Sequence, residues 1–291
     1  MSWRTVVISN RAKLDFKMNY MVVRNNQETT RIFINEIYMV IIESTAVSLT
    51  AVLLSELTKK KVKVIFCDEK RNPSSELVSY YGSHDTSIKY RNQLEWGVDI
   101  KSEVWTYIVK EKIKKQSELL KERGHAEYAI LKRYIDEIEI NDKTNREGHA
   151  AKVYFNALFG KKFNRTDDNT INAALNYGYS IILSAFTREI VANGYMTQLG
   201  MFHNNMFNQF NLASDLMEPY RILVDRKVVR MDLNKFEICE KLELVDILNE
   251  NVIIDKMKNN VANAISQYTK SIFNALNECD ISRIRFYRNE L

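Results

Sequence analysis

Residues 1–70 carry short apolar runs separated by turn residues, a pattern typical of β-strands. The runs are rich in β-branched and aromatic side chains and cover 5–8, 12–16, 20–23, 31–34, 37–42 and 62–66. Asn25, Asn26 and Asn35 supply turn chemistry between them. A helix is predicted over 46–57, with Thr45 as its N-terminal cap. We therefore expect a small β-rich region with one helix.

Apolar positions beyond residue 87 follow a helical period instead. Helical stripes are predicted over 105–120, 150–159, 171–186 and 257–276, and glycines at 124, 160 and 194 end the first three. The intervening segment 72–85 combines Pro, Ser and Gly, which is typical of a linker. The pattern predicts an α+β protein with a β-rich domain over 1–72, a linker over 73–87 and a helical domain over 88–291.

Composition supports an ordered protein with long helices. Only 8 glycines and 2 prolines occur in 291 residues, of which 45% are hydrophobic and 27% charged. The three cysteines, Cys67, Cys239 and Cys279, form no disulfide framework or CxxC pattern, which favours a reducing compartment. Charged residues interrupt the first twenty positions, and Glu43 interrupts the apolar stretch 37–54. We expect a cytoplasmic protein without a signal peptide or a membrane span.

The net charge of +5 is carried entirely by residues 1–75, which hold 12 Lys and Arg against 7 Asp and Glu. This mild basicity is compatible with an acidic partner such as nucleic acid. It is equally compatible with an ordinary solvated surface.

The chain lacks the local motifs of nucleotide-driven and nucleophile-and-base enzymes, so metal chemistry is the remaining catalytic option. Four histidines can take part. His84 and Asp85 form an HD doublet of the kind that binds metal in phosphohydrolases, although small polar residues flank it as in a plain linker. Glu147 follows Thr144 at capping-box spacing, so it serves either as a cap or as a ligand at a helix start. His149 is two residues away and does not share its helix face.

A second group of candidates lies between residues 200 and 221. His203 stands in a loop dense in amides and aromatics, which could contact phosphates and stack on bases or could be structural. Asp215 and Glu218 have i,i+3 spacing, which predicts one shared helix face. Carboxylates near a histidine suit Mg²⁺ or Mn²⁺. The alternative is two exposed acids, or an ion pair from Glu218 to Arg221 or Arg188.

Taken in order, these segments resemble the CRISPR-associated spacer-acquisition integrase, the endonuclease/integrase of CRISPR adaptation. The resemblance is carried by 147–155, 175–179, His203 with its asparagine-rich loop, 215–221 and 224–225. The loop 205–212 resembles members from type II systems most. The similarity extends over essentially the whole chain.

The resemblance implies a metal site formed by Glu147, His203 and Glu218, which would be both catalytic residues and ligands of Mg²⁺ or Mn²⁺. It implies an assisting acid at Asp215 and a polar-aromatic stretch beside the site at Asn176 and Tyr177. Further candidates for supporting or DNA-contacting roles are Asn204, Asn208 and Arg221. Tyr220 replaces the phenylalanine usual in the motif, a departure that should leave the metal site intact.

The resemblance also implies the reaction and the partners. A 3′-OH of captured spacer DNA would attack a phosphodiester of the CRISPR repeat, a transesterification that needs no ATP. The partners would be DNA, a second copy of the chain joined through the β-domains, and a small second Cas protein bridging two dimers. Type II relatives further imply contact with the effector nuclease and a ring-shaped accessory protein. Two alternatives stay open: an HD-type metal phosphohydrolase using His84 and Asp85, and a non-catalytic helical nucleic-acid-binding scaffold.

Overall fold

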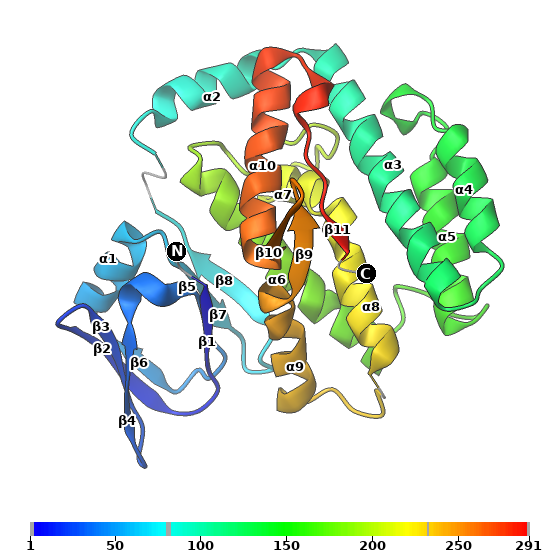
Figure 1. The fold of residues 1–291 in the computed structure, drawn as a ribbon. Helices are drawn as coiled ribbons and strands as arrows, with labels where there is room; N and C mark the ends of the chain where they lie inside the picture. The colour runs from blue at the N-terminus through cyan, green and yellow to red at the C-terminus, as the bar shows by residue number, and fades with distance from the viewer. Residues whose placement is uncertain (1–2, 80–82, 232, 290–291) are drawn as a thin grey trace.

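The computed structural model describes residues 3–79, 83–231 and 233–289, and it shows a β-rich N-terminal region beside a larger helical region (Figure 1). The predicted α+β class is confirmed. The N-terminal elements, in chain order, are β1 (Arg4–Ile8), β2 (Ala12–Lys17), β3 (Tyr20–Arg24), β4 (Thr29–Phe33), η1 (Ile34–Glu36), β5 (Ile37–Ile42), β6 (Val47–Leu49), α1 (Ala51–Lys59), β7 (Lys63–Cys67) and β8 (Pro73–Leu77).

These strands form two four-stranded sheets. One has the order β1-β5-β7-β8, with β1, β5 and β7 parallel and β8 antiparallel to β7. The other has the order β4-β3-β2-β6, antiparallel except that β6 runs parallel to β2. All six residues of β5 are buried, as expected for a parallel strand that is covered on both faces.

The two faces of β5 belong to two different apolar clusters. Val40 and Ile42 pack within the N-terminal region, against residues such as Leu14. Met39 and Ile41 join the cluster that continues through the helical region. The first sheet is therefore the layer that joins the two regions, and a shared core runs across their junction.

The helical region begins at Thr86. Its elements are α2 (Thr86–Glu95), α3 (Val98–Glu122), α4 (Tyr128–Asp136), η2 (Ile140–Asp142), α5 (Arg146–Phe159), α6 (Thr170–Ala192), α7 (Asn211–Leu216), η3 (Glu218–Tyr220), α8 (Arg221–Arg230), α9 (Ile238–Val245), η4 (Asp246–Asn249), β9 (Asn251–Ile254), β10 (Met257–Asn260), α10 (Val261–Glu278), η5 (Ile281–Arg283) and β11 (Arg288–Asn289). Figure 1 shows α3, α4 and α5 packed together on the side away from the N-terminal sheets.

Three sequence predictions need correction. The first helix begins at Ala51 rather than residue 46, because Val47–Leu49 pair with β2 and Thr50 caps the helix by accepting a hydrogen bond from Leu53 N at 3.3 Å. Pro73–Leu77, placed in the linker, form strand β8 against β7. Residues 80–82 of that predicted linker lie outside the described part.

The last predicted helix begins too early. Met257–Asn260 form β10, which pairs with β9 and makes a small sheet with β11. Asp255 and Lys256 turn this hairpin with φ of 48° and 64°, the backbone that a two-residue turn requires. Glycine is the usual signal for such a turn, and its absence here explains why the pattern did not reveal the hairpin.

None of the described helices is both long and apolar enough to span a bilayer.

Candidate functional site

Two of the predicted acids meet in the helical region through a lysine that the sequence did not single out. Glu147 lies in the first turn of α5, and Glu218 opens the short helix η3. Lys112, in the middle of α3, places its ammonium group between them. It pairs with Glu147 and lies 2.5 Å from Glu218 Oε2. The structure therefore brings both carboxylates to one cation.

Glu147 is available for this contact because other side chains cap its helix. Asn145 Oδ1 accepts a hydrogen bond from Gly148 N at 3.2 Å. Asp142 accepts from Arg146 N at 2.8 Å and from Glu147 N at 3.0 Å. The capping-box interpretation of Thr144 and Glu147 is thus wrong, because the amides at the start of α5 already have acceptors.

Glu218 is buried, with 4% of its surface exposed, and is held by two cations. Arg221 Nε donates to its Oε1 at 2.9 Å, so the predicted ion pair with Arg221 exists. Oε2 faces Lys112 as an ion pair but outside hydrogen-bonding geometry. Burial alone would raise the pKa of Glu218, yet the charges of Arg221 and Lys112 outweigh it and hold the pKa below its usual range.

Lys112 is correspondingly kept charged. Burial lowers the pKa of its ammonium group, but the charges of Glu218 and Glu147 outweigh burial and raise the pKa overall. A cation is therefore stable at this position.

His203 is held from behind by Asp215, which is fully buried. Asp215 Oδ1 accepts from His203 N at 3.0 Å and lies 2.5 Å from His203 Nδ1, while Oδ2 accepts from Met201 N at 2.6 Å and Phe202 N at 3.1 Å. This pairing leaves Nε2 of the imidazole as the nitrogen free for a ligand. The close approach also requires Gly200, because a Cβ there would lie 2.3 Å from His203 O and 2.8 Å from Asp215 Oδ2.

The electrostatics of His203 follow from this geometry. The hydrogen bond to Asp215 raises the pKa of the imidazole above its usual value, and partial burial opposes the rise. The negative charges of Asp215, Glu218 and Glu147 raise the pKa of His203 further. Trp105 of α3 supports the ring edge-on, at 5.6 Å between centroids.

Asp215 and Glu218 do not share a helix face, contrary to the i,i+3 prediction. Asp215 lies near the end of α7, and Glu218 begins η3 with Pro219 at its first turn. The change of helix type turns Asp215 toward the His203 loop and Glu218 toward Lys112. Within residues 3–79, 83–231 and 233–289, no three His, Cys, Asp or Glu side chains lie close enough together to hold a metal ion.

A hollow of about 240 Å³ opens beside the two glutamates. Its lining includes Lys112, Arg165 and Arg221, together with Tyr179 and Asp225. Arg165 and Arg221 each lie over the ring of Tyr179, at 5.5 Å and 4.8 Å. Lys112 and Arg165 are functional candidates that sequence reasoning missed. No local pattern marks them, since they reach the site from α3 and from the connection between α5 and α6.

Of the other residues predicted for the site, some lie near the hollow and some lie elsewhere. Asn176 is exposed and accepts from Arg165 Nη2 at 2.7 Å, so it lies next to the hollow. Asn204 is exposed, and Asn208 caps its own loop by accepting from Phe210 N at 2.9 Å. Tyr177 lies elsewhere: it is 2% exposed and donates to Glu43 of the N-terminal region at 3.2 Å, so its side chain is closed to DNA.

His84 and Asp85 take no part in this arrangement. Asp85 accepts a hydrogen bond from Ser83 and lies 3.8 Å from Lys89, contacts that fit the polar-linker interpretation. The HD-type metal site therefore gains no support from the structure.

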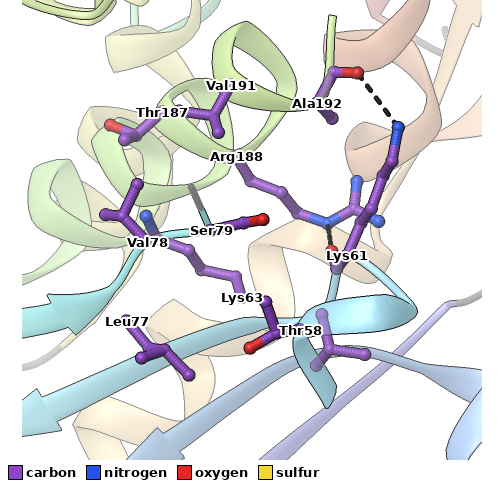
Figure 2. A pocket seen from close by; sticks show the side chains of 11 residues that line it. Thr58, Lys61, Lys63, Leu77, Val78, Ser79, Thr187, Arg188, Val191 and Ala192 are labelled. Atoms are coloured by element: carbon purple, nitrogen blue, oxygen red, sulfur yellow. Dashed lines mark hydrogen bonds between the residues drawn. The ribbon is translucent and has the colours of Figure 1, made fainter. Parts of the chain in front are cut away.

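A different hollow, of about 40 Å³, lies where the N-terminal region meets α6 (Figure 2). Figure 2 shows Arg188 reaching across to Lys61, whose carbonyl accepts from Arg188 Nε at 2.8 Å. Lys61 Nζ donates in turn to Ala192 O at 3.2 Å, and Lys63 pairs with Glu76. Because these cations already hold the junction together, we assign this hollow to structure rather than chemistry.

The sequence is also similar to known proteins. Residues 5–242 match the family model described as CRISPR associated protein Cas1. The CRISPR-associated endonuclease Cas1 of Neisseria meningitidis serogroup C is 35% identical over 232 residues, covering 79% of this chain and 76% of that protein. A Cas1 endonuclease of Francisella tularensis subsp. novicida is 24% identical over 276 residues, covering 86% and 84%.

Solved structures show the same fold at low identity. A casposase bound to an integration product matches with a TM-score of 0.77 and 16% identity, over 97% of this chain and 92% of that one. A Cas1 protein from Thermotoga maritima matches with a TM-score of 0.73 and 16% identity, over 94% and 97%. A chain of a Cas6-RT-Cas1–Cas2 complex gives a TM-score of 0.74 and 17% identity, with 99% of this chain covered and 36% of that one.

Proposed function

The chain belongs to the Cas1 family of CRISPR-associated endonucleases, and from this premise we propose that it joins the 3′-OH ends of captured spacer DNA to the CRISPR repeat. The observation that carries the proposal is the cation held between Glu147 and Glu218, beside a histidine oriented by a buried acid. A site that stabilises positive charge next to an imidazole suits phosphodiester chemistry.

The donor types suit Mg²⁺ or Mn²⁺, and the three side chains would have to draw closer together around the ion. The Lys112 ammonium stands in for a cation between the two carboxylates, and one buried oxygen, Glu218 Oε2, has no hydrogen-bond donor. Two carboxylates with one imidazole match the preferences of these ions. Glu147, Glu218 and Nε2 of His203 would hold the ion, with Lys112 turning away from the carboxylates. When bound, the ion supplies polarisation of the scissile phosphate.

The reaction balances without an energy source. A DNA 3′-OH gives up its proton and forms a new P–O bond at the phosphorus of the repeat. The P–O bond to the displaced 3′ oxygen breaks, and that oxygen takes up a proton. One phosphodiester replaces another, which agrees with the lack of a phosphate loop in the sequence. With water as the attacking group, the same site would hydrolyse DNA.

The protein's own side chains bind and orient the substrate in this scheme. Lys112, Arg165 and Arg221 line the hollow beside the acids and would contact DNA phosphates there. Asp215 fixes the direction of the imidazole, which must be neutral at Nε2 to act as a ligand. DNA binding should weaken as salt is raised, because phosphate contacts release counterions.

The proposal also assigns roles to three segments of the chain and names the proteins with which it would assemble. The catalytic candidates all lie within residues 88–291, which we treat as the catalytic part, with 73–87 connecting it to 1–72. We expect residues 1–72 to form a homodimer, and two dimers to be bridged by the small second Cas protein. One matched structure is a complex that contains Cas1 and Cas2, which supports this expectation. Contact with the type II effector nuclease and the ring-shaped accessory protein is a further expectation.

A strand-transfer assay on a plasmid that contains the repeat tests the proposal, with and without the small partner and with or without EDTA. Glu147→Gln, His203→Ala and Glu218→Gln should each abolish transfer while DNA binding persists. His84→Ala is the matched control and should transfer at the wild-type rate. Full activity of the His203→Ala variant would refute the assignment of the site.

The same assay separates the two alternatives. An HD-type phosphohydrolase would lose its metal on His84→Ala and tolerate Glu218→Gln. A non-catalytic scaffold would bind DNA in EDTA and show no strand transfer with any divalent ion.

A further inference from the structure

The loop that follows His203 ends in two unusually exposed apolar side chains. Met206 is 87% exposed and Phe207 is 86% exposed, more than any other large apolar side chain in the described ranges, where Met18 follows at 80%. Two neighbouring apolar side chains left in water forgo the free energy of burial, which a contact with a partner would recover.

The loop presents these side chains on a stiff frame. Asn211 Nδ2 donates to Asn205 O and to Gln198 O, both at 3.0 Å, and so ties the two ends of the loop together. Asn205 Oδ1 accepts from Phe207 N at 2.9 Å, which fixes the turn at the tip. The exposure of Met206 and Phe207 is therefore built into the loop.

The tip lies within reach of any DNA held at His203. Four residues of extended chain span about 14 Å at most, so Phe207 lies within that distance of His203 along the backbone. Consecutive bases of one strand are about 3.4 Å apart. A phosphodiester placed at His203 would thus bring the tip against base steps no more than about four positions away.

The chemistry of the segment favours bases over phosphates. Residues 190–214 contain no Lys, Arg, Asp or Glu, so the tip neither attracts the phosphate backbone nor repels it. Exposed Asn204 and Gln209 flank the apolar pair. Amides that read base edges, combined with a Phe or Met wedge between bases, are the groups that proteins use to unstack and kink duplex DNA.

We propose that Met206 and Phe207 form a wedge that enters the base stack of duplex DNA beside the phosphodiester held at His203. This rests on the proposed function, since it needs DNA at that site. Opening one base step would bend the target and expose the phosphorus to the attacking 3′-OH. Pyrimidine–purine steps unstack most easily, so the wedge also predicts a preference for such steps next to the joining position.

Fluorescence of 2-aminopurine, which rises when the base unstacks, tests the wedge directly. The probe is placed in turn at each step flanking the repeat junction, and binding is measured in EDTA so that no reaction is needed. The wild-type protein should raise the signal at one or two adjacent steps. Met206→Ala/Phe207→Ala should lower that rise at least fivefold, and Phe207→Leu should keep most of it. Met18→Ala, a change at another strongly exposed methionine, in the turn after β2, is the matched control and should behave as wild type.

Strand transfer separates this proposal from the proposed function. The double variant should transfer at least tenfold more slowly than wild type on a fully paired target, with DNA affinity changed less than about threefold because phosphate contacts remain. A mismatch at the unstacked step removes the cost of opening and should bring the variant within about threefold of wild type.

Three results would overturn the wedge while leaving the proposed function standing: normal transfer by the double variant, no fluorescence change with wild-type protein, or no rescue by the mismatch. Loss of binding to the small partner with unchanged DNA unstacking would assign the tip to a protein contact instead. Failure of the proposed function would show differently, as wild-type protein inactive in transfer with any divalent ion.

Discussion

Asp215 is predicted to organise the His203 loop, and Asp215→Asn tests this with a change of nearly equal size. Each carboxylate oxygen of Asp215 has two donors: His203 N and Nδ1 at one, Met201 N and Phe202 N at the other. Asparagine replaces one oxygen with an NH₂ group, so two of these four donors lose their acceptor.

The magnitude follows from the number of bonds lost. A hydrogen bond to a charged acceptor contributes about 1.5–3 kcal/mol, so losing two costs about 3–6 kcal/mol of loop stability. Because the loop can open without global unfolding, the loss should appear locally. At about 1.4 kcal/mol for each tenfold change, the amides of residues 201–203 should exchange with solvent at least about 100-fold faster.

Hydrogen exchange measured by mass spectrometry, with an NMR titration of His203 in metal-free protein, is the assay. Asp215 raises the pKa of His203 in the folded protein. The stabilisation that comes from this pair is therefore complete below the pKa of about 6.5 that His203 has in the unfolded chain, and it is lost as pH rises through the folded pKa. The penalty of Asp215→Asn should therefore be larger near pH 5.5 than near pH 8.5, and the pKa of His203 should fall. Asp99→Asn, at an exposed position of α3, is the control. Unchanged exchange and an unchanged His203 pKa in Asp215→Asn would refute the reasoning.

Three further predictions concern the surrounding core. Tyr220 is fully buried, and its hydroxyl has no hydrogen-bond partner. Removing this hydroxyl in Tyr220→Phe should stabilise the protein by about 1 kcal/mol and raise the melting temperature by about 2–4 °C, whereas a decrease would show that the hydroxyl makes a stabilising hydrogen bond. A Cβ on Gly178 would lie 2.4 Å from Val224 Cγ1, so Gly178→Ala should lower the melting temperature by about 5 °C, but by much less in a Val224→Ala background. Burial raises the pKa of Asp225 to about 6, and hydrogen bonds from two buried tyrosines partly oppose the rise. The folded protein therefore favours the protonated carboxyl group, and the free energy of unfolding falls as pH rises through 6. The Asp225→Asn variant should not show this loss of stability. The melting temperatures of both proteins, measured from about pH 4.5 to about pH 7, test this, and the same pH dependence in both would contradict the prediction.

The sequence pattern was sufficient for elements whose signals are local. The stripe through Trp105 predicted α3, and the glycines at 160 and 194 marked the ends of α5 and α6, where φ is 96° and 84°. Pairing between distant segments was not predictable in this way. Val47–Leu49 became a strand because β2 lies beside them, and that neighbour is invisible in a helical window.

The residues of the candidate site could be predicted only in part. The acids and the histidine could be named, because their segments resemble a family in a fixed order. The cations could not, because Lys112 is separated from Glu147 by 35 positions and looks like any polar residue of an amphipathic helix. Only the packing of α3 against α5 and η3 gives Lys112 its two partners.

Asp215 and Glu218 show why spacing alone misassigned their roles. On a continuous helix they would face the same way and repel each other. The chain instead changes helix type at Met217, with Pro219 in the first turn of η3, and the two carboxylates diverge. Asp215 then accepts hydrogen bonds from the His203 loop, and Glu218 pairs with Lys112 and Arg221. The break gives each acid its own partners, so two carboxylates three residues apart are both buried, one positioning a histidine and the other pairing with a lysine and an arginine.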